Sequence, residues 1–161
     1  MKRVYAVLLG VVMGLGLVTP AVASAAPVVS RDQAVKVVLE RGLAQVGVPY
    51  SWAGGGIDGP SLGTGTGETI VGFDSSGLIQ YVYAGVNAKL PRSSGAMYQV
   101  GQKVTPDQAL PADLIFYGPE GTTTVTMFMG NNQMLEVTDT GVMVSPVRTT
   151  DRSPYLVRII A

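Results

Sequence analysis

The sequence of 161 residues contains no cysteine and no histidine. These absences exclude a thiol nucleophile, a disulfide, a metal site built from thiolate or imidazole, and any mechanism in which imidazole moves a proton near neutral pH. The 11 basic residues balance the 11 acidic ones and form no basic run, which argues against nucleic acid or an anionic membrane surface as a partner. Most hydrolase mechanisms are therefore excluded, and we expect no metal and no cofactor.

Residues 1–25 have the pattern of a secretory signal peptide. Basic residues precede an uncharged run at 4–18, and small residues before position 26 offer a cleavage site after Ala25, with a cut after Ala23 as the alternative. The apolar run is shorter than the ~20 residues that span a bilayer, so we expect membrane attachment only if the signal is not cleaved. A chain of this length folds without disulfides, so the lack of cysteine is compatible with export.

Two amphipathic helices are predicted in the first half of the chain. The Ser-Arg-Asp-Gln stretch at 30–33 is a capping box, and apolar residues at helical spacing then continue until Gly47, which predicts a helix over 31–46. Asp74 is predicted to cap a second helix, whose apolar face covers 78–86. A short helical stretch is expected further on, from Ser94 to Gln99.

Residues 53–72 lie between the two long helices and contain eight glycines, which predicts a long surface loop. A phosphate-binding loop is the alternative interpretation. The Gly-Thr-Gly-Thr-Gly stretch at 63–67, however, lacks the Lys-Ser/Thr ending of a P-loop and follows no clear strand. A flexible loop is therefore favoured over a nucleotide site.

The second half of the chain is rich in β-branched and aromatic residues separated by turn residues. This pattern predicts strands at 114–117, 123–129, 133–137, 142–147 and 155–160. Helices followed by hairpin-connected strands are typical of an α+β fold, and we expect residues 26–161 to form one such domain.

Several short segments follow one another in a distinctive order. They are Val-Pro-Tyr-Ser-Trp-Ala-Gly-Gly at 48–55, Phe-Asp-Ser-Ser-Gly-Leu at 73–78, Leu-Pro-Arg-Ser-Ser at 90–94, Pro-Ala-Asp-Leu-Ile-Phe-Tyr at 111–117, and Thr-Val-Thr-Met-Phe-Met-Gly-Asn at 124–131. Together they resemble the NlpC family of bacterial peptidoglycan endopeptidases. Residues 133–136 and 154–158 look most like its Rip subgroup, in particular the non-catalytic RipD type. The likeness covers about residues 31–160. It implies a reduced papain-like α+β domain, with N-terminal helices packed on an antiparallel β-sheet, in a bacterial cell wall.

The resemblance also identifies the positions of the family's reaction centre. Active members use a cysteine at the start of the central helix to cleave the bond between γ-D-glutamate and the diamino acid of the stem peptide. This cysteine corresponds to Ser75, the family's histidine to Thr124 and its third polar residue to Glu136. An alcohol needs a general base during attack, and the hydroxyl of Thr124 does not accept that proton usefully. We therefore expect a catalytically inactive domain.

Two mechanisms without imidazole are alternatives. A Ser–Lys dyad requires a lysine near Ser75, but no lysine lies at Ser-x-x-Lys spacing from it; the lysines of the mature chain are Lys36, Lys89 and Lys103. Glycosidic cleavage requires two carboxylates ~5–9.5 Å apart, for which the resemblance offers only Asp74 and Glu136. We expect instead that Asp74 caps its helix and that Glu136 remains from an ancestral triad.

The resemblance implies that ligand-recognition positions are retained although the catalytic ones are not. In the family, several residues line or support the pocket for the part of the stem peptide before the scissile bond. The corresponding residues here are Tyr50, Asp74, Ser76, Arg92 and Ser94. We expect Asp74 to pair with an amine of the ligand, and the two serines to bind its carboxylate. Each position also has a structural interpretation: a core aromatic, a helix cap, an ion-pair partner or an ordinary first-turn serine.

Four further residues are interpreted as structural. Trp52 is predicted to be a half-buried core aromatic, and Asp113 a turn or support residue. Met127 and Met129 alternate with Phe128 along a predicted strand, which is typical of core packing.

These inferences predict an exported, monomeric, non-catalytic domain that binds peptidoglycan stem peptides in a degenerate active-site groove. Two other functions stay open from the sequence. One is a protein-interaction or regulatory module that docks on active wall hydrolases, and the other is a residual endopeptidase.

Overall fold

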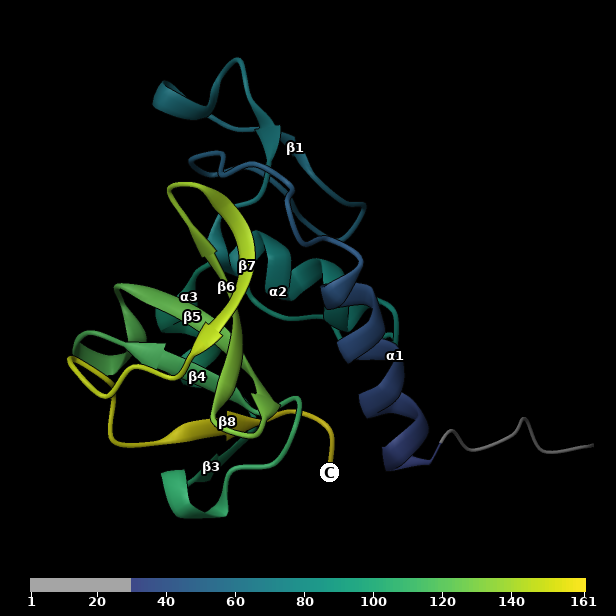
Figure 1. Cartoon of the computed structure of the whole chain (residues 1–161), viewed down its shortest axis with the longest axis vertical. Helices are drawn as coiled ribbons and strands as arrows, with labels where there is room; N and C mark the ends of the chain where they lie inside the picture. The colour runs from purple at the N-terminus through teal and green to yellow at the C-terminus, as the bar shows by residue number, and fades with distance from the viewer. Residues whose placement is uncertain (1–29) are drawn as a thin grey trace, which may run out of the picture.

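The computed structural model describes residues 30–161, which form helices followed by an antiparallel sheet (Figure 1). The helices are α1 (Arg31–Leu43), α2 (Ser75–Ala84) and α3 (Ser94–Tyr98), with short 3₁₀ turns at Gly65–Gly67, Pro106–Gln108 and Pro119–Gly121. The strands are β1 (Ser61–Leu62), β2 (Val71–Gly72), β3 (Gln102–Val104), β4 (Leu114–Tyr117), β5 (Thr124–Gly130), β6 (Gln133–Thr138), β7 (Gly141–Pro146) and β8 (Leu156–Arg158). The predicted signal segment 1–25 lies outside the described residues.

The main sheet has six strands in the order β3-β8-β4-β5-β6-β7, and every neighbouring pair is antiparallel. The order confirms the predicted α+β architecture. Strand β3 was not predicted, because its three residues, Gln-Lys-Val, contain one buried apolar side chain and too little alternation to indicate a strand. Strands β1 and β2 form a separate two-residue ladder inside the predicted loop 53–72.

Helix α1 begins as predicted. The Ser30 side chain accepts a hydrogen bond from the Gln33 backbone N–H, and the Gln33 side chain accepts one from the Ser30 backbone, which completes the capping box. The helix ends at Leu43, not at the predicted residue 46. The physical reason is that the Gly47 N–H donates to the Val142 carbonyl of β7, which draws residues 44–47 into turns.

No helix within residues 30–161 combines the length and the apolarity that crossing a membrane requires.

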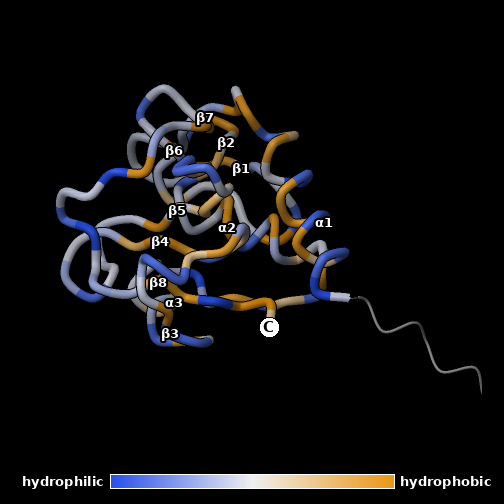
Figure 2. The backbone as a smooth tube through the Cα atoms, turned by 60° about the horizontal axis from the view of Figure 1, so that its bottom comes forward, coloured by the Kyte–Doolittle hydropathy of each residue, from blue (hydrophilic) through white to orange (hydrophobic). Residues whose placement is uncertain are grey.

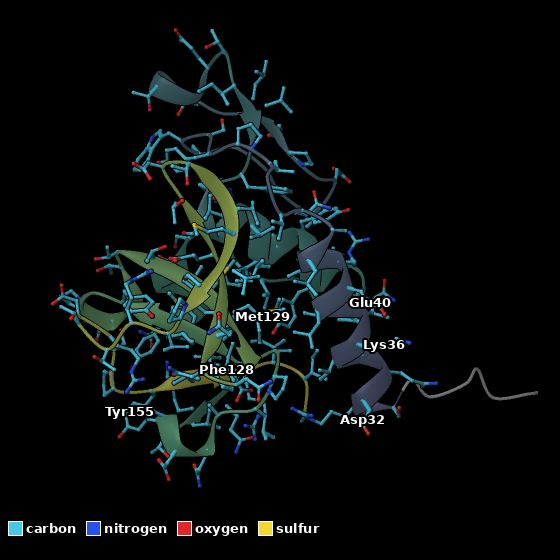
Figure 3. The ribbon with its side chains drawn as sticks, viewed as in Figure 1. Asp32, Lys36, Glu40, Phe128, Met129 and Tyr155 are labelled. Carbon is cyan, nitrogen blue, oxygen red and sulfur yellow. The ribbon has the colours of Figure 1, made fainter. Side chains whose placement is uncertain are left out.

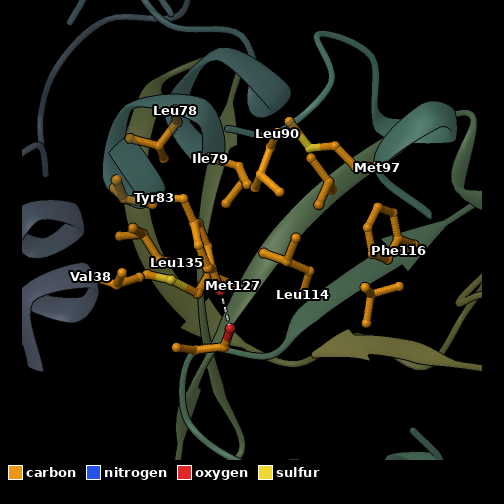
Figure 4. Packing of buried hydrophobic residues seen from close by; sticks show 14 of the residues in the cluster. Val38, Leu78, Ile79, Tyr83, Leu90, Met97, Leu114, Phe116, Met127 and Leu135 are labelled. Atoms are coloured by element: carbon orange, nitrogen blue, oxygen red, sulfur yellow. Dashed lines mark hydrogen bonds between the residues drawn. The ribbon is translucent and has the colours of Figure 1, made fainter. Parts of the chain in front are cut away.

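The main core lies between α2 and one face of the sheet (Figure 4). The fully buried side chains of α2 pack on β4, β5 and β6, and Val38 of α1 packs beside them. The helix contributes Leu78, Ile79, Val82 and Tyr83, and the sheet contributes Leu114, Met127 and Leu135. The hydroxyl of Tyr83 donates to the Ala112 carbonyl, and burial raises the pKa of this phenol far above its usual value. Figure 2 shows that hydrophilic segments lie on the outer loops.

A smaller apolar cluster covers the other face of the sheet and contains Val104, Ile115, Tyr117, Met134 and Leu156. Phe128 packs against this cluster, whereas Met127 and Met129 pack on the α2 side. This arrangement confirms the predicted alternation of β5 and the core role of its methionines.

A buried ion pair joins the loop before β4 to the last strand. Asp113 is 1% exposed, and its carboxylate accepts hydrogen bonds from Arg158 Nε at 2.9 Å, from Arg158 Nη2 at 2.7 Å and from the Leu110 N–H at 2.7 Å. These contacts confirm the predicted support role of Asp113.

We predict that Asp113→Ala lowers the free energy of unfolding by about 3–5 kcal/mol, because it leaves a largely buried guanidinium without its counter-charge. Urea denaturation measures the change. The matched control is Glu40→Ala, which removes the exposed Lys36–Glu40 pair on the outer face of α1 (Figure 3). Its expected cost is about 0.3–0.5 kcal/mol. Equal costs for the two variants would contradict the prediction.

Candidate functional site

An open cleft of about 410 Å³ lies at the N-terminal end of α2. Four chain segments line it, together with Val137 of β6: residues 50 and 52–53, 74–76, 92–94 and 122–124. The cleft thus brings together the loop before β1, the first turn of α2, the start of α3 and the β4–β5 connection. All five predicted binding residues, and two of the three reaction-centre positions, lie along this one surface.

Ser75 and Thr124 both line the cleft. Ser75 is the first residue of α2, and Thr124 is the first residue of β5. Ser75 is thus contributed by the helix and Thr124 by the sheet that packs on it. The family resemblance places a nucleophile at the first position and its base at the second. Both now present hydroxyl groups.

Glu136 does not line the cleft. Its side chain is 5% exposed and accepts hydrogen bonds from Ser145 Oγ and from Arg148 Nη1, the latter at 2.5 Å. Thr126 Oγ1 of β5 lies 3.4 Å from Met134 Sδ of β6, so these two side chains share one face of the sheet. Side chains alternate along a strand, so Thr124 and Glu136, each two residues away, lie on that face as well. The carboxylate therefore lies on the same side of the sheet as Thr124 but is held by residues of β7 and the segment after it.

A dense hydrogen-bond network forms one side of the cleft around Asp74. Its Oδ1 caps α2 by accepting from the Gly77 N–H at 2.7 Å and also accepts from Ser76 Oγ at 3.2 Å. Both oxygens accept from Arg92, through Nη1 at 2.9 Å and Nη2 at 2.7 Å. The same guanidinium donates to Ser76 Oγ at 2.7 Å and to the Gly54 carbonyl at 3.3 Å.

This network confirms the predicted cap and identifies Asp74 as the acidic partner of Arg92. The carboxylate that we expect to pair with a ligand amine is thus already paired with Arg92 inside the protein, and its Oδ2 accepts one hydrogen bond. Of the charged side chains in the described residues, only these two line the cleft.

The remaining predicted binding residues differ in exposure. Tyr50 is half-buried, and both burial and the nearby negative charge of Asp74 raise the pKa of its phenol, so the hydroxyl stays protonated and able to donate. Ser76 and Ser94 are buried at the starts of α2 and α3. The structural interpretation of Trp52 is wrong: its side chain is 58% exposed and lines the cleft.

The geometry argues against both alternative mechanisms. None of the lysines within residues 30–161 lines the cleft; Lys36 pairs with Glu40 on α1, and the Lys103 ammonium donates to the Tyr98 carbonyl. The carboxylates proposed for glycosidic cleavage are each engaged with an arginine, and only one of them reaches the cleft. Within residues 30–161, no cluster of three acidic or other metal-ligating side chains is present.

Comparison with known proteins relates this arrangement to a family. The model of the NlpC/P60 family matches residues 47–161. The chain is 51% identical over 136 residues to the peptidoglycan endopeptidase RipA of Mycobacterium tuberculosis, an alignment that covers 83% of this chain and 29% of RipA. The chain thus spans less than a third of that relative. Three solved RipA structures carry substitutions at a cysteine, a histidine and a glutamate, spaced 49 and 12 residues apart in that order.

Two solved structures are more similar in sequence. The P60 domain of an antigen from M. avium paratuberculosis is 67% identical, with a TM-score of 0.79, and the match covers 80% of this chain and 95% of that one. RipD from M. tuberculosis is 66% identical, with a TM-score of 0.77 and coverage of 79% and 98%. RipD is described as a non-catalytic NlpC/p60 domain protein adapted to peptidoglycan binding. On sequence, fold and coverage, the chain belongs to the NlpC/P60 family.

Proposed function

We propose that this domain is a non-catalytic peptidoglycan-binding module that holds stem peptides in the cleft at the start of α2. The observation that carries the proposal is the combination of an open cleft with hydroxyl groups at both Ser75 and Thr124. The surface for a ligand is present, whereas a nucleophile with a base beside it is not.

The spacing of the residues substituted in RipA supports these assignments. Ser75 and Thr124 are 49 residues apart and Thr124 and Glu136 are 12 apart, which are the separations of the cysteine, histidine and glutamate in RipA. Loss of a triad member leaves only ~10³–10⁴-fold acceleration over water in serine proteases. Loss of both the thiol and the imidazole leaves this domain with a binding surface.

Recognition in such a cleft depends on placed polar groups. The Asp74–Arg92 pair fixes the shape of one wall, since the guanidinium spans from the α2 cap to the Gly54 carbonyl. The protonated phenol of Tyr50 and the hydroxyls of Ser75 and Thr124 are available to amides and carboxylates of a peptide ligand. This is the set of groups that a short, polar stem peptide needs.

The proposal places the mature protein outside the cytoplasmic membrane, in the bacterial cell wall, as a monomer. An inactive domain that occupies stem peptides competes with active wall hydrolases for the same sites. A regulatory effect on wall remodelling then follows from mass action, without a direct protein contact.

We predict that purified peptidoglycan pulls down residues 26–161 and that Asp74→Asn and Arg92→Ala each weaken this binding about tenfold. Asparagine still caps a helix as well as aspartate does, so the first variant removes the negative charge that pairs with Arg92 while α2 keeps its cap. Sedimentation of the protein with insoluble peptidoglycan measures the bound fraction.

Lys36→Ala is the matched control, because Lys36 is an exposed charged residue of α1 outside the cleft. Its binding should equal that of the parent protein. No binding by the parent protein, or equal binding by the parent and both cleft variants, would contradict the proposal.

We also predict that Ser75→Cys alone does not create useful hydrolysis. The new thiol would be the only cysteine of the chain. The N-terminus of α2 lowers its pKa from ~8.5, but without an imidazolium at position 124 the pKa should stay above that of a cysteine paired with histidine, and no group would protonate the leaving amine. The pH dependence of its alkylation by iodoacetamide gives that pKa, and muropeptide release gives the activity. Rapid turnover by the single variant would show that the site contains a base we have not identified.

A further inference from the structure

Among the described residues that line the cleft, Trp52 is the large apolar side chain that stem-peptide recognition does not require. It is the only tryptophan in the chain, and 58% of its side chain is exposed to solvent. A flat aromatic surface left in water at the edge of a binding cleft is a typical anchor for a ligand with a complementary apolar face. The neighbouring lining residue Ala53 adds no charge to this part of the cleft.

The backbone beneath this indole is held firmly by the glycine-rich stretch at 63–67. The Trp52 carbonyl accepts a hydrogen bond from the Thr64 N–H at 2.9 Å, and buried Ser51 donates through Oγ to the Gly67 carbonyl at 3.2 Å. A Cβ on Gly63 would overlap the Trp52 carbonyl oxygen, and one on Gly67 would lie 2.6 Å from the Trp52 nitrogen. Glycine is therefore required at both positions, and the loop presents the indole from a fixed backbone.

The network around Asp74 indicates which ligands reach this surface. Both carboxylate oxygens already accept hydrogen bonds from Arg92, and Oδ1 also accepts from the helix N-terminus. The charge of the Asp74 carboxylate is thus already balanced by Arg92, which weakens its attraction for a free amino terminus. A stem peptide whose first nitrogen is an amide needs no such partner, and in peptidoglycan that amide links the peptide to the lactyl group of an N-acetylated amino sugar.

We infer that Trp52 is a stacking platform for a sugar ring of the glycan strand, so that the domain binds the stem peptide together with the sugar that carries it. This inference rests on the proposed stem-peptide function and extends its ligand. A pyranose ring presents a flat face of C–H groups, which matches an uncharged indole plane. In peptidoglycan this sugar is the next group beyond the first amino acid of the peptide, and Trp52 lines the same cleft as the residues proposed to hold the peptide.

The test compares two ligands that differ only in the sugars: a stem tripeptide whose first nitrogen carries a lactyl amide, and the disaccharide muropeptide that carries the same tripeptide. Isothermal titration calorimetry with residues 26–161 should give about tenfold tighter binding of the muropeptide. Because the chain has a single tryptophan, its fluorescence reports on this site alone, and the muropeptide should shift or quench the emission more strongly than the tripeptide.

Trp52→Ala should abolish the advantage of the muropeptide, so that the variant binds the two ligands with equal affinity. Ile57→Ala is the matched control, since Ile57 is an exposed apolar residue of the same loop that does not line the cleft. Equal affinities of the parent protein for both ligands would overturn the sugar platform while the proposed function stands, as would equal weakening of both ligands by Trp52→Ala. Failure of both ligands to bind would overturn the proposed function itself, and the platform with it.

Discussion

The carboxylate of Asp74 joins three parts of the chain that build the cleft. It caps α2, pairs with Arg92 ahead of α3 and, through that arginine, connects to the Gly54 carbonyl in the loop before β1. A partly buried charge is tolerated only where such partners surround it. Because this network holds the cleft without using the side chains of Ser75 or Thr124, the shape of the site does not depend on its chemistry.

The third reaction-centre position shows the same separation of shape from chemistry. Glu136 is buried on β6, and a buried carboxylate without a partner is strongly unfavourable. Arg148 and Ser145 satisfy it from β7 and the segment that follows. The guanidinium of Arg148 also lies 4.7 Å from the centre of the Tyr117 ring. The negative charge of Glu136 is thus paired beside the sheet, and its carboxylate does not line the cleft.

Local patterns predicted much of the fold, because caps and alternation act over a few residues. The capping box of α1, the Asp74 cap and the bounds of β4 needed no tertiary information. That Ser75 and Thr124 share a cleft could be predicted only through the family resemblance. The exposure of Trp52 was missed because it depends on how closely residues 63–67 pack on its backbone. Likewise, the acidic partner of Arg92 lies 18 residues away and no local pattern identifies it.

The central claim is that the domain binds peptidoglycan and does not cut it. Mass spectrometry of the soluble products, after prolonged incubation of purified peptidoglycan with residues 26–161, tests this claim most directly. The account predicts protein in the insoluble fraction and no peptide fragments beyond those of a buffer control. Fragments cleaved between γ-D-glutamate and the diamino acid, present with the parent protein and absent with Ser75→Ala, would contradict it.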